Sequence, residues 1–256
     1  MSERFSLDGR VAIVTGGGTG IGRGVALVLA EHGADVALAG RRAELLETTA
    51  KDVETLGRRA LALPTDVTEP GQCARLVDAT LRELGRVDIL VNNAGGGRTK
   101  PILDWADDEW HQVLDVNLGS VWFLSRYAAR PMLEQRKGAI VNISSGASLL
   151  AMPQAAIYGA AKAGVNNLTG AMAAAWTRKG VRVNNVAVGA VRTEMLAEDA
   201  ARNGIDVEEL GKTNAMGRLG EPDEIGYAVL FFASDASSFC SGQTLYVHGG
   251  PGLTGV

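Results

Sequence analysis

Residues 11–22 of this 256-residue chain read VAIVTGGGTGIG. The apolar start is typical of a short buried strand, and Ile21 and Val25 begin the apolar face of a helical segment. A helix amino terminus carries unpaired N–H groups, and glycines let a phosphate approach the main chain. The spacing departs from the common G-x-G-x-x-G, and a tight turn without a ligand is the alternative. The position between strand and helix favours a dinucleotide site formed by Gly16, Thr19, Gly20, Ile21 and Gly22.

The same alternation of strand and helix continues along the chain. Short apolar runs typical of strands occur at 11–14, 36–39, 60–63, 89–91, 140–143, 181–188 and 245–247. Segments with helical periodicity fill the gaps, which predicts an α/β fold of Rossmann type, a doubly wound parallel sheet with helices on both faces. We expect one dinucleotide-binding and catalytic domain over 1–256. Residues 194–214 interrupt the pattern, as either a substrate lid or a surface excursion without a role.

Composition and charge argue against several classes of protein. The chain is 46% apolar and 21% charged with a net charge of -4, so it lacks the basic excess of nucleic-acid-binding proteins. It has no run of 18 apolar residues, and residues 1–10 lack the apolar core of a secretion signal, so we expect a cytoplasmic protein that does not bind membranes. Cys73 and Cys240 are far apart and belong to no Cys/His cluster, which predicts neither a metal site nor a disulfide.

The second predicted strand ends in AGRR, residues 39–42. An NAD site usually has an acidic residue here for the ribose hydroxyls, whereas a guanidinium can bind the additional 2′-phosphate of NADP. We therefore expect NADP as the cofactor, bound by Arg41, with NAD also possible. The alternative is that Arg41, Arg42 and Arg23 are solvated surface residues.

Tyr158 and Lys162 lie four residues apart in a segment of strong helix formers, so they share one helix face. We expect the ammonium, together with the positive nicotinamide ring, to lower the pKa of the phenol from about 10 to about 7, which requires roughly 4 kcal/mol. Such a phenol can act as a general acid and base. Ser145 follows the strand at 140–143 and would reach the same edge to bind a substrate oxygen, unless it only forms a turn or helix cap.

These motifs, taken in order, resemble those of the short-chain dehydrogenase/reductase family, particularly its 3-oxoacyl-reductase-like members, over nearly the whole chain. The matching motifs are 15–22, Asp66-Val67, Asn92-Asn93-Ala94-Gly95, Asn117, Ser145, Tyr158 with Lys162, and 189–193. The resemblance implies that Asp66 and Val67 border the adenine. It likewise implies that Asn93, Ala94 and Gly95 border the ribose, and that Val191 and Thr193 contact the nicotinamide carboxamide.

The resemblance further implies that Lys162 binds the nicotinamide ribose and that Asn117 supports a water relay that reprotonates Tyr158. Each borrowed role has a structural alternative: a kink for Asn117, a turn for Asp66, and ties between sheet and loops for Asn92 and Asn93. Two departures from the family pattern stand out. Val188 replaces a proline that is common before Gly189, and His248 replaces an acidic residue near an end that commonly packs between subunits.

We therefore expect an NADP-dependent oxidoreductase that moves a hydride between nicotinamide and a carbonyl or secondary alcohol, with Tyr158 as acid and base. An enoyl-thioester reductase and a non-catalytic dinucleotide sensor are the alternatives. The expected partners are a small carbonyl or alcohol substrate and further copies of the chain, as a homotetramer or dimer. The loops 96–102, 149–154 and 194–214 would close a pocket with apolar walls.

Overall fold

The computed structural model describes residues 3–250, and its centre is a seven-stranded sheet in the order β3-β2-β1-β4-β5-β6-β7. All neighbouring strands pair in parallel. The strands are β1 (Val11–Thr15), β2 (Asp35–Gly40), β3 (Ala60–Pro64), β4 (Ile89–Asn92), β5 (Gly138–Ser145), β6 (Val181–Val188) and β7 (Thr244–Val247). Each coincides with a predicted strand to within one residue at either end, except that β5 begins two residues earlier and ends two later. The predicted doubly wound parallel fold is confirmed.

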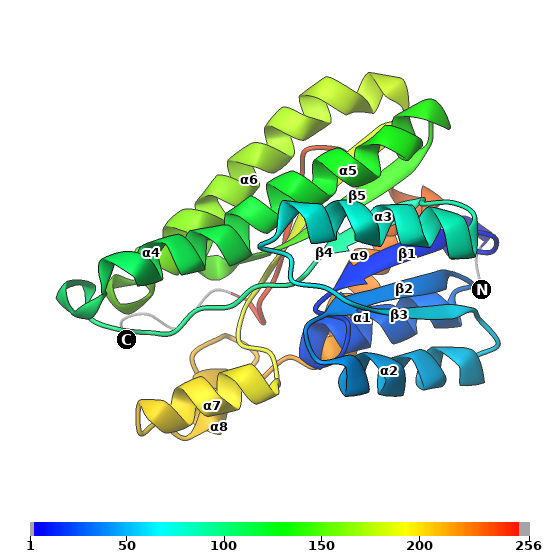
Figure 1. The fold of residues 1–256 in the computed structure, drawn as a ribbon. Helices are drawn as coiled ribbons and strands as arrows, with labels where there is room; N and C mark the ends of the chain where they lie inside the picture. The colour runs from blue at the N-terminus through cyan, green and yellow to red at the C-terminus, as the bar shows by residue number, and fades with distance from the viewer. Residues whose placement is uncertain (1–2, 251–256) are drawn as a thin grey trace.

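Helices cover both faces of the sheet (Figure 1). The helices are α1 (Gly20–Glu31), α2 (Ala43–Thr55), α3 (Pro70–Leu84), α4 (Asp107–Leu114), α5 (Ser120–Glu134), α6 (Ala156–Trp176), α7 (Glu194–Arg202), α8 (Val207–Gly211) and α9 (Pro222–Ala233). Buried residues of α1, α2 and α9 form one core layer, and those of α3, α5 and α6 form the other. The inner strands β1, β2, β4, β5 and β6 are buried between these two layers, as near-continuous apolar strands require.

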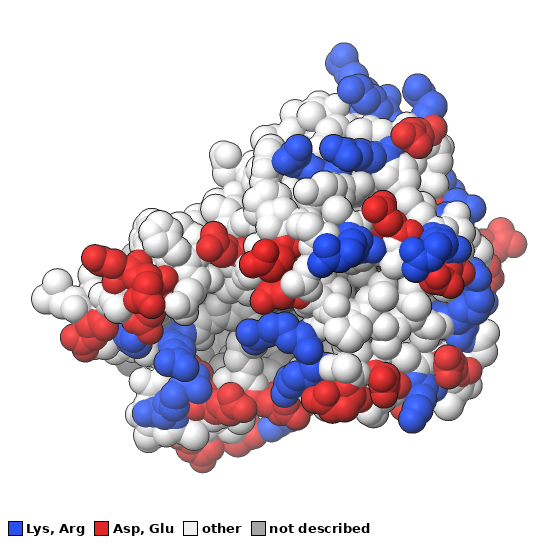
Figure 2. Space-filling model, in the orientation of Figure 1, with Lys and Arg blue, Asp and Glu red and all other residues white. Residues whose placement is uncertain are grey.

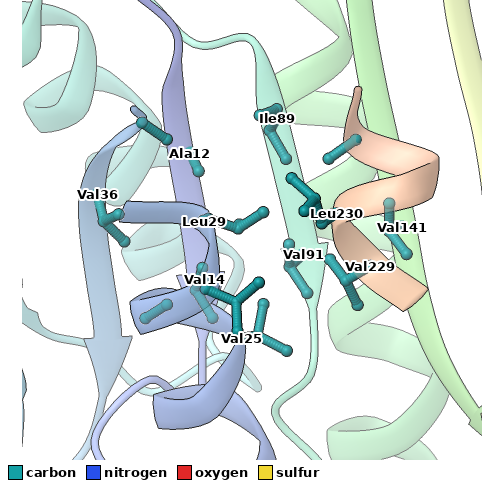
Figure 3. Packing of buried hydrophobic residues seen from close by; sticks show 14 of the residues in the cluster. Ala12, Val14, Val25, Leu29, Val36, Ile89, Val91, Val141, Val229 and Leu230 are labelled. Carbon is teal, nitrogen blue, oxygen red and sulfur yellow. The ribbon is translucent and has the colours of Figure 1, made fainter. Parts of the chain in front are cut away.

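Alternation along β1 serves both layers at once. Ala12 and Val14 belong to the first layer, whereas Val11 and Ile13 belong to the second. Figure 3 shows Ala12 and Val14 on the side of the sheet where Leu29 of α1 lies. Successive side chains of a strand point to opposite faces, so a run without polar residues indicates a strand covered on both sides.

The strand order reverses next to β1, and this places the candidate site. The chain runs from β1 outward through β2 to β3 and then returns to β4 on the other side of β1. Ligands of such sheets bind at the carboxyl ends of the strands near this reversal. The segments that follow β1, β4, β5 and β6 all emerge at this edge.

Residues 194–214, which interrupted the sequence pattern, contain α7 and α8. Figure 1 shows both helices standing out from the body of the chain, beside the carboxyl edge of the sheet. Only Ala200 of α7 and Gly211 of α8 are buried. Among residues 3–250, no helix is both long and apolar enough to cross a membrane.

Candidate active site

The glycine-rich turn leaves the first turn of α1 open. Thr19 is the N-cap residue, in an extended conformation, and makes no side-chain capping bond. Gly16 and Gly20 have φ of 65° and 50°, a region that L residues other than glycine rarely adopt. The first N–H groups of α1 are therefore available to a phosphate, which also gains from the positive end of the helix dipole.

Close packing explains the remaining glycine of the motif and the neighbouring asparagine. A Cβ at Gly22 would lie 2.1 Å from the carbonyl oxygen of Gly16, so only glycine fits there. Asn93 Nδ2 donates to Thr15 O at 2.8 Å, and the backbone N–H groups of Asn93 and Ala94 donate to Thr15 Oγ1. Asn93 thus has the structural role that the sequence left open, tying the turn after β4 to the turn after β1. Its place beside a ribose stays a prediction.

Basic side chains stand at the end of β2. Arg42 donates to Thr19 Oγ1 at 3.4 Å, so it reaches the glycine-rich turn. Hydrogen bonds from Thr68 lower the pKa of the Asp66 carboxyl, and nearby Arg41 lowers it further. Asp66 therefore forms the turn named as its alternative role, within the electrostatic reach of Arg41. Its neighbour in the motif, Val67, is buried.

Figure 2 shows Lys and Arg side chains gathered between the α7–α8 segment and the α1–α2 segment. Arg23 is not available to bind a 2′-phosphate in this way, because its guanidinium pairs with Asp52 at 2.9 Å on the exposed surface. Exposed pairs of this kind contribute little to stability. The structure thus separates Arg41 and Arg42, which are exposed at the sheet edge, from Arg23, which has a carboxylate partner.

Helix α6 brings Tyr158 and Lys162 together, as their spacing predicted. Lys162 Nζ lies 5.5 Å from the centroid of the Tyr158 ring and donates to Ile143 O at 2.9 Å. Lys162 is only 3% exposed, and burial lowers the pKa of its ammonium to about 8. Gly97 packs on the same tyrosine, since a Cβ there would lie 3.2 Å from Tyr158 Cβ.

The chain without coenzyme does not show the acidification expected from Lys162 together with a bound nicotinamide ring, and acidification in the presence of coenzyme stays a prediction. Burial raises the pKa of Tyr158, and a hydrogen bond with Ser145 offsets this only in part. Removing a phenolate from water is costly, and that cost exceeds the benefit of the hydrogen bond. The Lys162 ammonium meanwhile donates to a backbone carbonyl. Helical spacing predicted the proximity of the two groups but not their solvation.

Ser145 is the last residue of β5 and caps the short turn that follows. Its Oγ accepts a hydrogen bond from Ala147 N at 3.2 Å, which is the cap proposed as its alternative role. A hydroxyl that accepts one hydrogen bond still has its proton to donate, and Ser145 also bonds Tyr158. Ser144 belongs to another set of contacts, because its Oγ donates to Asn166 Oδ1 at 2.7 Å.

Asn117 lies in a π-helical turn, Asp115–Gly119, between α4 and α5. Its Nδ2 donates to Val113 O at 2.9 Å and to Gly96 O at 2.7 Å, and its Oδ1 accepts from Gly96 N at 3.0 Å. A Cβ on Gly95 would lie 2.7 Å from Asn117 Oδ1 and 3.3 Å from Lys162 Nζ. The kink foreseen for Asn117 is present, and it brings the amide next to Lys162. Single π turns occur frequently at functional sites.

The turn after β6 crosses over the glycine-rich turn. Thr193 is the N-cap residue of α7, and its Oγ1 accepts from Leu196 N at 3.2 Å. A Cβ at Gly20 would lie 3.0 Å from Thr193 Cγ2, so the two turns touch. Val191 is buried and pairs with Gly220 in an isolated bridge. The contacts of Val191 and Thr193 with a carboxamide stay predictions.

The two departures from the family pattern meet at one place. Val188 is the last residue of β6, and Gly189 follows it so closely against β7 that a Cβ would lie 2.8 Å from His248 Cβ. His248 Nδ1 is buried and has no hydrogen-bond partner within residues 3–250. His248 therefore packs into the turn after β6.

Sequence analysis missed a chain of buried polar side chains beneath α6. Asn92 Nδ2 donates to Asn142 Oδ1 at 2.8 Å, and Asn142 Nδ2 donates to Thr169 Oγ1 at 2.7 Å. Thr169 Oγ1 in turn donates to Asn185 Oδ1 at 2.6 Å. Buried polar groups need such partners, and the warning sign was an asparagine inside each of two apolar strands.

Large apolar side chains are exposed on the loops that we expect to close the pocket. Leu149, Leu150, Met152 and Met195 have exposed fractions of 66%, 68%, 49% and 52%. A recess of about 600 Å³ lies beside the start of α6 and is lined by Ile102, Trp105, Trp110, Ile157 and their neighbours. In the described part of the chain, no group of three or more His, Cys, Asp or Glu side chains could hold a metal ion.

An open helix amino terminus after the first strand, with a serine, tyrosine and lysine at the same sheet edge, defines a Rossmann-type oxidoreductase site. The family model that matches residues 16–251 is described as enoyl-(acyl carrier protein) reductase. The chain belongs to the short-chain dehydrogenase/reductase family, and its resemblance to 3-oxoacyl reductases is confirmed. Its relatives are named dehydrogenases and reductases that act on alcohol and carbonyl groups, so the chain belongs to a family of enzymes.

The relatives span nearly the full chain. Gluconate 5-dehydrogenase of Gluconobacter oxydans is 40% identical over 97% of this chain and 96% of its own length. A 3-oxoacyl-[acyl-carrier-protein] reductase of Chlamydia muridarum is 39% identical over 95% and 98%. The structure of NAD⁺-bound xylitol dehydrogenase has a TM-score of 0.88 at 31% identity and covers 95% of this chain and 99% of its own. An Agrobacterium tumefaciens structure with bound NADP has a TM-score of 0.85 at 35% identity and covers 97% and 98%.

Proposed function

We propose that this chain is an NADP-dependent oxidoreductase that moves a hydride between nicotinamide and a carbonyl or secondary alcohol carbon, with Tyr158 as acid and base. One observation carries the proposal: Tyr158 lies beside both Ser145 and Lys162 at the carboxyl edge of the sheet, where α1 opens its amino terminus. Glycines cradle this end of the site at positions where a Cβ would clash. Bound nicotinamide would supply or accept the hydride.

The residues of the chain handle the proton. In reduction, the Tyr158 phenol donates its proton to the carbonyl oxygen as that oxygen gains charge, and Ser145 donates a second hydrogen bond to it. A phenol whose pKa is raised by burial is protonated at neutral pH, which is the form that reduction needs. The Lys162 ammonium, with a pKa of about 8, is charged at neutral pH and stabilises the phenolate that remains. Asn117, beside Lys162, would hold the water that returns the proton.

Replacing Tyr158 with phenylalanine tests the proposal. Tyr158→Phe removes the proton donor and keeps the ring, so we expect kcat for ketone reduction to fall by about 10²- to 10⁴-fold, the usual contribution of a general acid. Tyr227→Phe on the exposed surface of α9 is the matched control and should keep the wild-type rate. Circular dichroism checks the fold of both variants. A Tyr158→Phe enzyme that reduces ketones at the wild-type rate would refute the proposed role.

The preference for NADP rests on the end of β2, where Arg41 and Arg42 stand and no acidic residue does. Charge-assisted hydrogen bonds to a 2′-phosphate contribute about 1.5–3 kcal/mol each, so NADP should bind at least tenfold more tightly than NAD. We expect Arg41→Ala and Arg42→Ala to lose this difference in a thermal-shift titration and to keep the response to NAD. Arg23→Ala, which breaks only a surface ion pair, should change neither response. Equal affinity of the wild type for both nucleotides would contradict the assignment.

Reduction of an enoyl thioester is a second candidate, favoured by the description of the matching family model. It uses the same coenzyme site but delivers the hydride to a carbon–carbon double bond. A panel of ketones, secondary alcohols and enoyl thioesters, followed by the absorbance of the reduced nicotinamide, separates the two reactions. Turnover of thioesters alone would replace the first proposal. No observation favours a non-catalytic sensor.

We further propose a single catalytic domain with residues 194–214 as its substrate lid, assembled as a homotetramer or dimer. Several large apolar side chains are exposed, including two on the edge strand β7. They are Leu245 and Tyr246 of β7, Phe239 and Trp122. Such surfaces commonly serve as subunit interfaces. Light scattering should give a mass of two or four chains, and a monomer would refute this assembly.

A further inference from the structure

The loop from Gly95 to Lys100 contacts the catalytic groups along its first half. Gly96 exchanges two hydrogen bonds with the Asn117 amide, and Gly97 packs on the ring of Tyr158. At its far end, Lys100 N donates to Gln154 O at 2.8 Å, next to the start of α6. A shift of this loop would therefore be felt at the π turn and at the catalytic tyrosine.

The second half of the loop contacts the last turn of α7 through one side chain. Thr99 Oγ1 donates to Asp199 Oδ2 at 3.0 Å and accepts from Asn203 Nδ2 at 2.9 Å. Asn203 Nδ2 also donates to the backbone carbonyl of Asp199 at 2.7 Å, so the Thr99 hydroxyl and the Asn203 amide are both held on Asp199. The bond to the carboxylate is charge-assisted, and such bonds are stronger than neutral ones.

Within residues 3–250, α7 has little apolar contact with the rest of the chain. Ala200 is its one buried residue, so the nine-residue helix gains little stability from apolar burial. Near its start, Met195 lies against the same loop, because a Cβ at Gly96 would be 2.7 Å from Met195 Sδ. The following helix is attached to the body by the ion pair between Arg192 and Glu208. With so little burial, polar contacts decide whether α7 stays against the catalytic loop.

We propose that Thr99 is a positioning residue: it fastens α7 over the catalytic edge and thereby sets the substrate-side wall that Met195 forms beside Tyr158. This rests on the proposed function only for its effect on turnover. The hydroxyl acts through α7 and the loop. Thr99 contacts the last turn of α7, at the opposite end from Thr193, so we expect the contact of Thr193 with Gly20 to survive the loss of the hydroxyl.

Thr99→Val removes the hydroxyl at nearly constant shape, and Thr99→Ser restores it. Trypsin reports on α7 directly, since Arg202 lies in its last turn and Lys212 just beyond α8. We expect cleavage at these two sites to be about tenfold faster in Thr99→Val. The loss of one charge-assisted hydrogen bond makes the form in which α7 has detached about tenfold more populated. Thr99→Ser should be cleaved at the wild-type rate. The matched control is Thr48→Val on α2, whose hydroxyl donates to the Glu44 carbonyl and which should also match the wild type.

Turnover gives the second readout. In the closed form of the lid, α7 lies against the loop from Gly95 to Lys100. When Thr99→Val makes this form less populated, the apparent affinity for substrate falls, so KM for the carbonyl substrate should rise three- to tenfold. Saturating substrate closes the lid again, so kcat should stay within twofold and the thermal shift with NADP should be unchanged.

The possible failures are distinguishable. Wild-type cleavage of Thr99→Val by trypsin overturns the proposed fastening of α7, and this measurement uses neither substrate nor coenzyme. Faster cleavage with an unchanged KM overturns the effect on the substrate wall. An active Tyr158→Phe enzyme would instead refute the proposed function and leave the proteolysis result standing.

Discussion

Lys162→Met should change the pH dependence of stability by an amount that follows from burial. The pKa of Lys162 falls from 10.5 to about 8 in the folded chain because its ammonium is removed from water. Between these values the unfolded chain binds a proton that the folded chain does not, so wild-type stability rises with pH. Below pH 8 Lys162 is charged in both the folded and the unfolded chain, so the folded chain bears the full cost of burying the ammonium. At about 1.4 kcal/mol per pH unit, the interval corresponds to about 3 kcal/mol.

Methionine keeps the length of the side chain but has no charge, so the variant should lack this rise. It also loses the bond to Ile143 O, but that loss is nearly independent of pH and cancels when slopes are compared. Urea unfolding without coenzyme at pH 6.5, 8 and 9.5 measures the difference. From pH 8 to 9.5 the wild type should gain about 2 kcal/mol relative to Lys162→Met. Lys179→Met, at an exposed position, should follow the wild type, and parallel curves for Lys162→Met would refute the argument.

Three further predictions follow from contacts in the site. Thr169→Val should destabilise the fold by about 2–4 kcal/mol in urea unfolding, because it removes the hydrogen bonds of two buried atoms, Asn142 Nδ2 and Asn185 Oδ1. Gly22→Ala should abolish the thermal shift with NADP, because its Cβ would lie 2.1 Å from Gly16 O; an unchanged shift would show that the turn can open. In an alkaline absorbance titration without coenzyme, the difference between wild type and Tyr158→Phe should appear only above pH 10, since burial raises the pKa of Tyr158. Ionisation of Tyr158 near pH 7 without coenzyme would instead show that Lys162 alone lowers the pKa of the phenol.

The sequence predicted the strands well because their apolar runs are buried on both faces. Residues 181–188, for example, were expected to form a strand and coincide with β6 at both ends. The glycine-rich turn was also predictable, since its glycines are needed for a positive φ or for close packing of nearby backbone. The spacing of Tyr158 and Lys162 fixed their proximity for the same reason: four residues of helix bring side chains together whatever the rest of the chain does.

Properties that depend on distant parts of the chain were not readable. The direction of the Tyr158 pKa shift depends on how deeply the surrounding elements bury the ring, which no local pattern encodes. The contact of Thr99 with Asp199 joins residues a hundred positions apart, and nothing in either segment marks it. Asn142 was visible as a polar residue in an apolar strand, but its partner Thr169 lies in a different element.

The wide turn at Asp115–Gly119 has a consequence for how this gene can change length. A π turn holds one residue more than the α-helical turn it replaces, so deleting one residue there can restore regular geometry while α4 and α5 keep their relative orientation. Leu124, Ala128 and Met132 of α5 would then stay enclosed. The loss would fall on Asn117, whose amide holds Gly96 from this turn. A one-residue deletion here should therefore occur in descendants that have abandoned catalysis and be absent from those that keep it.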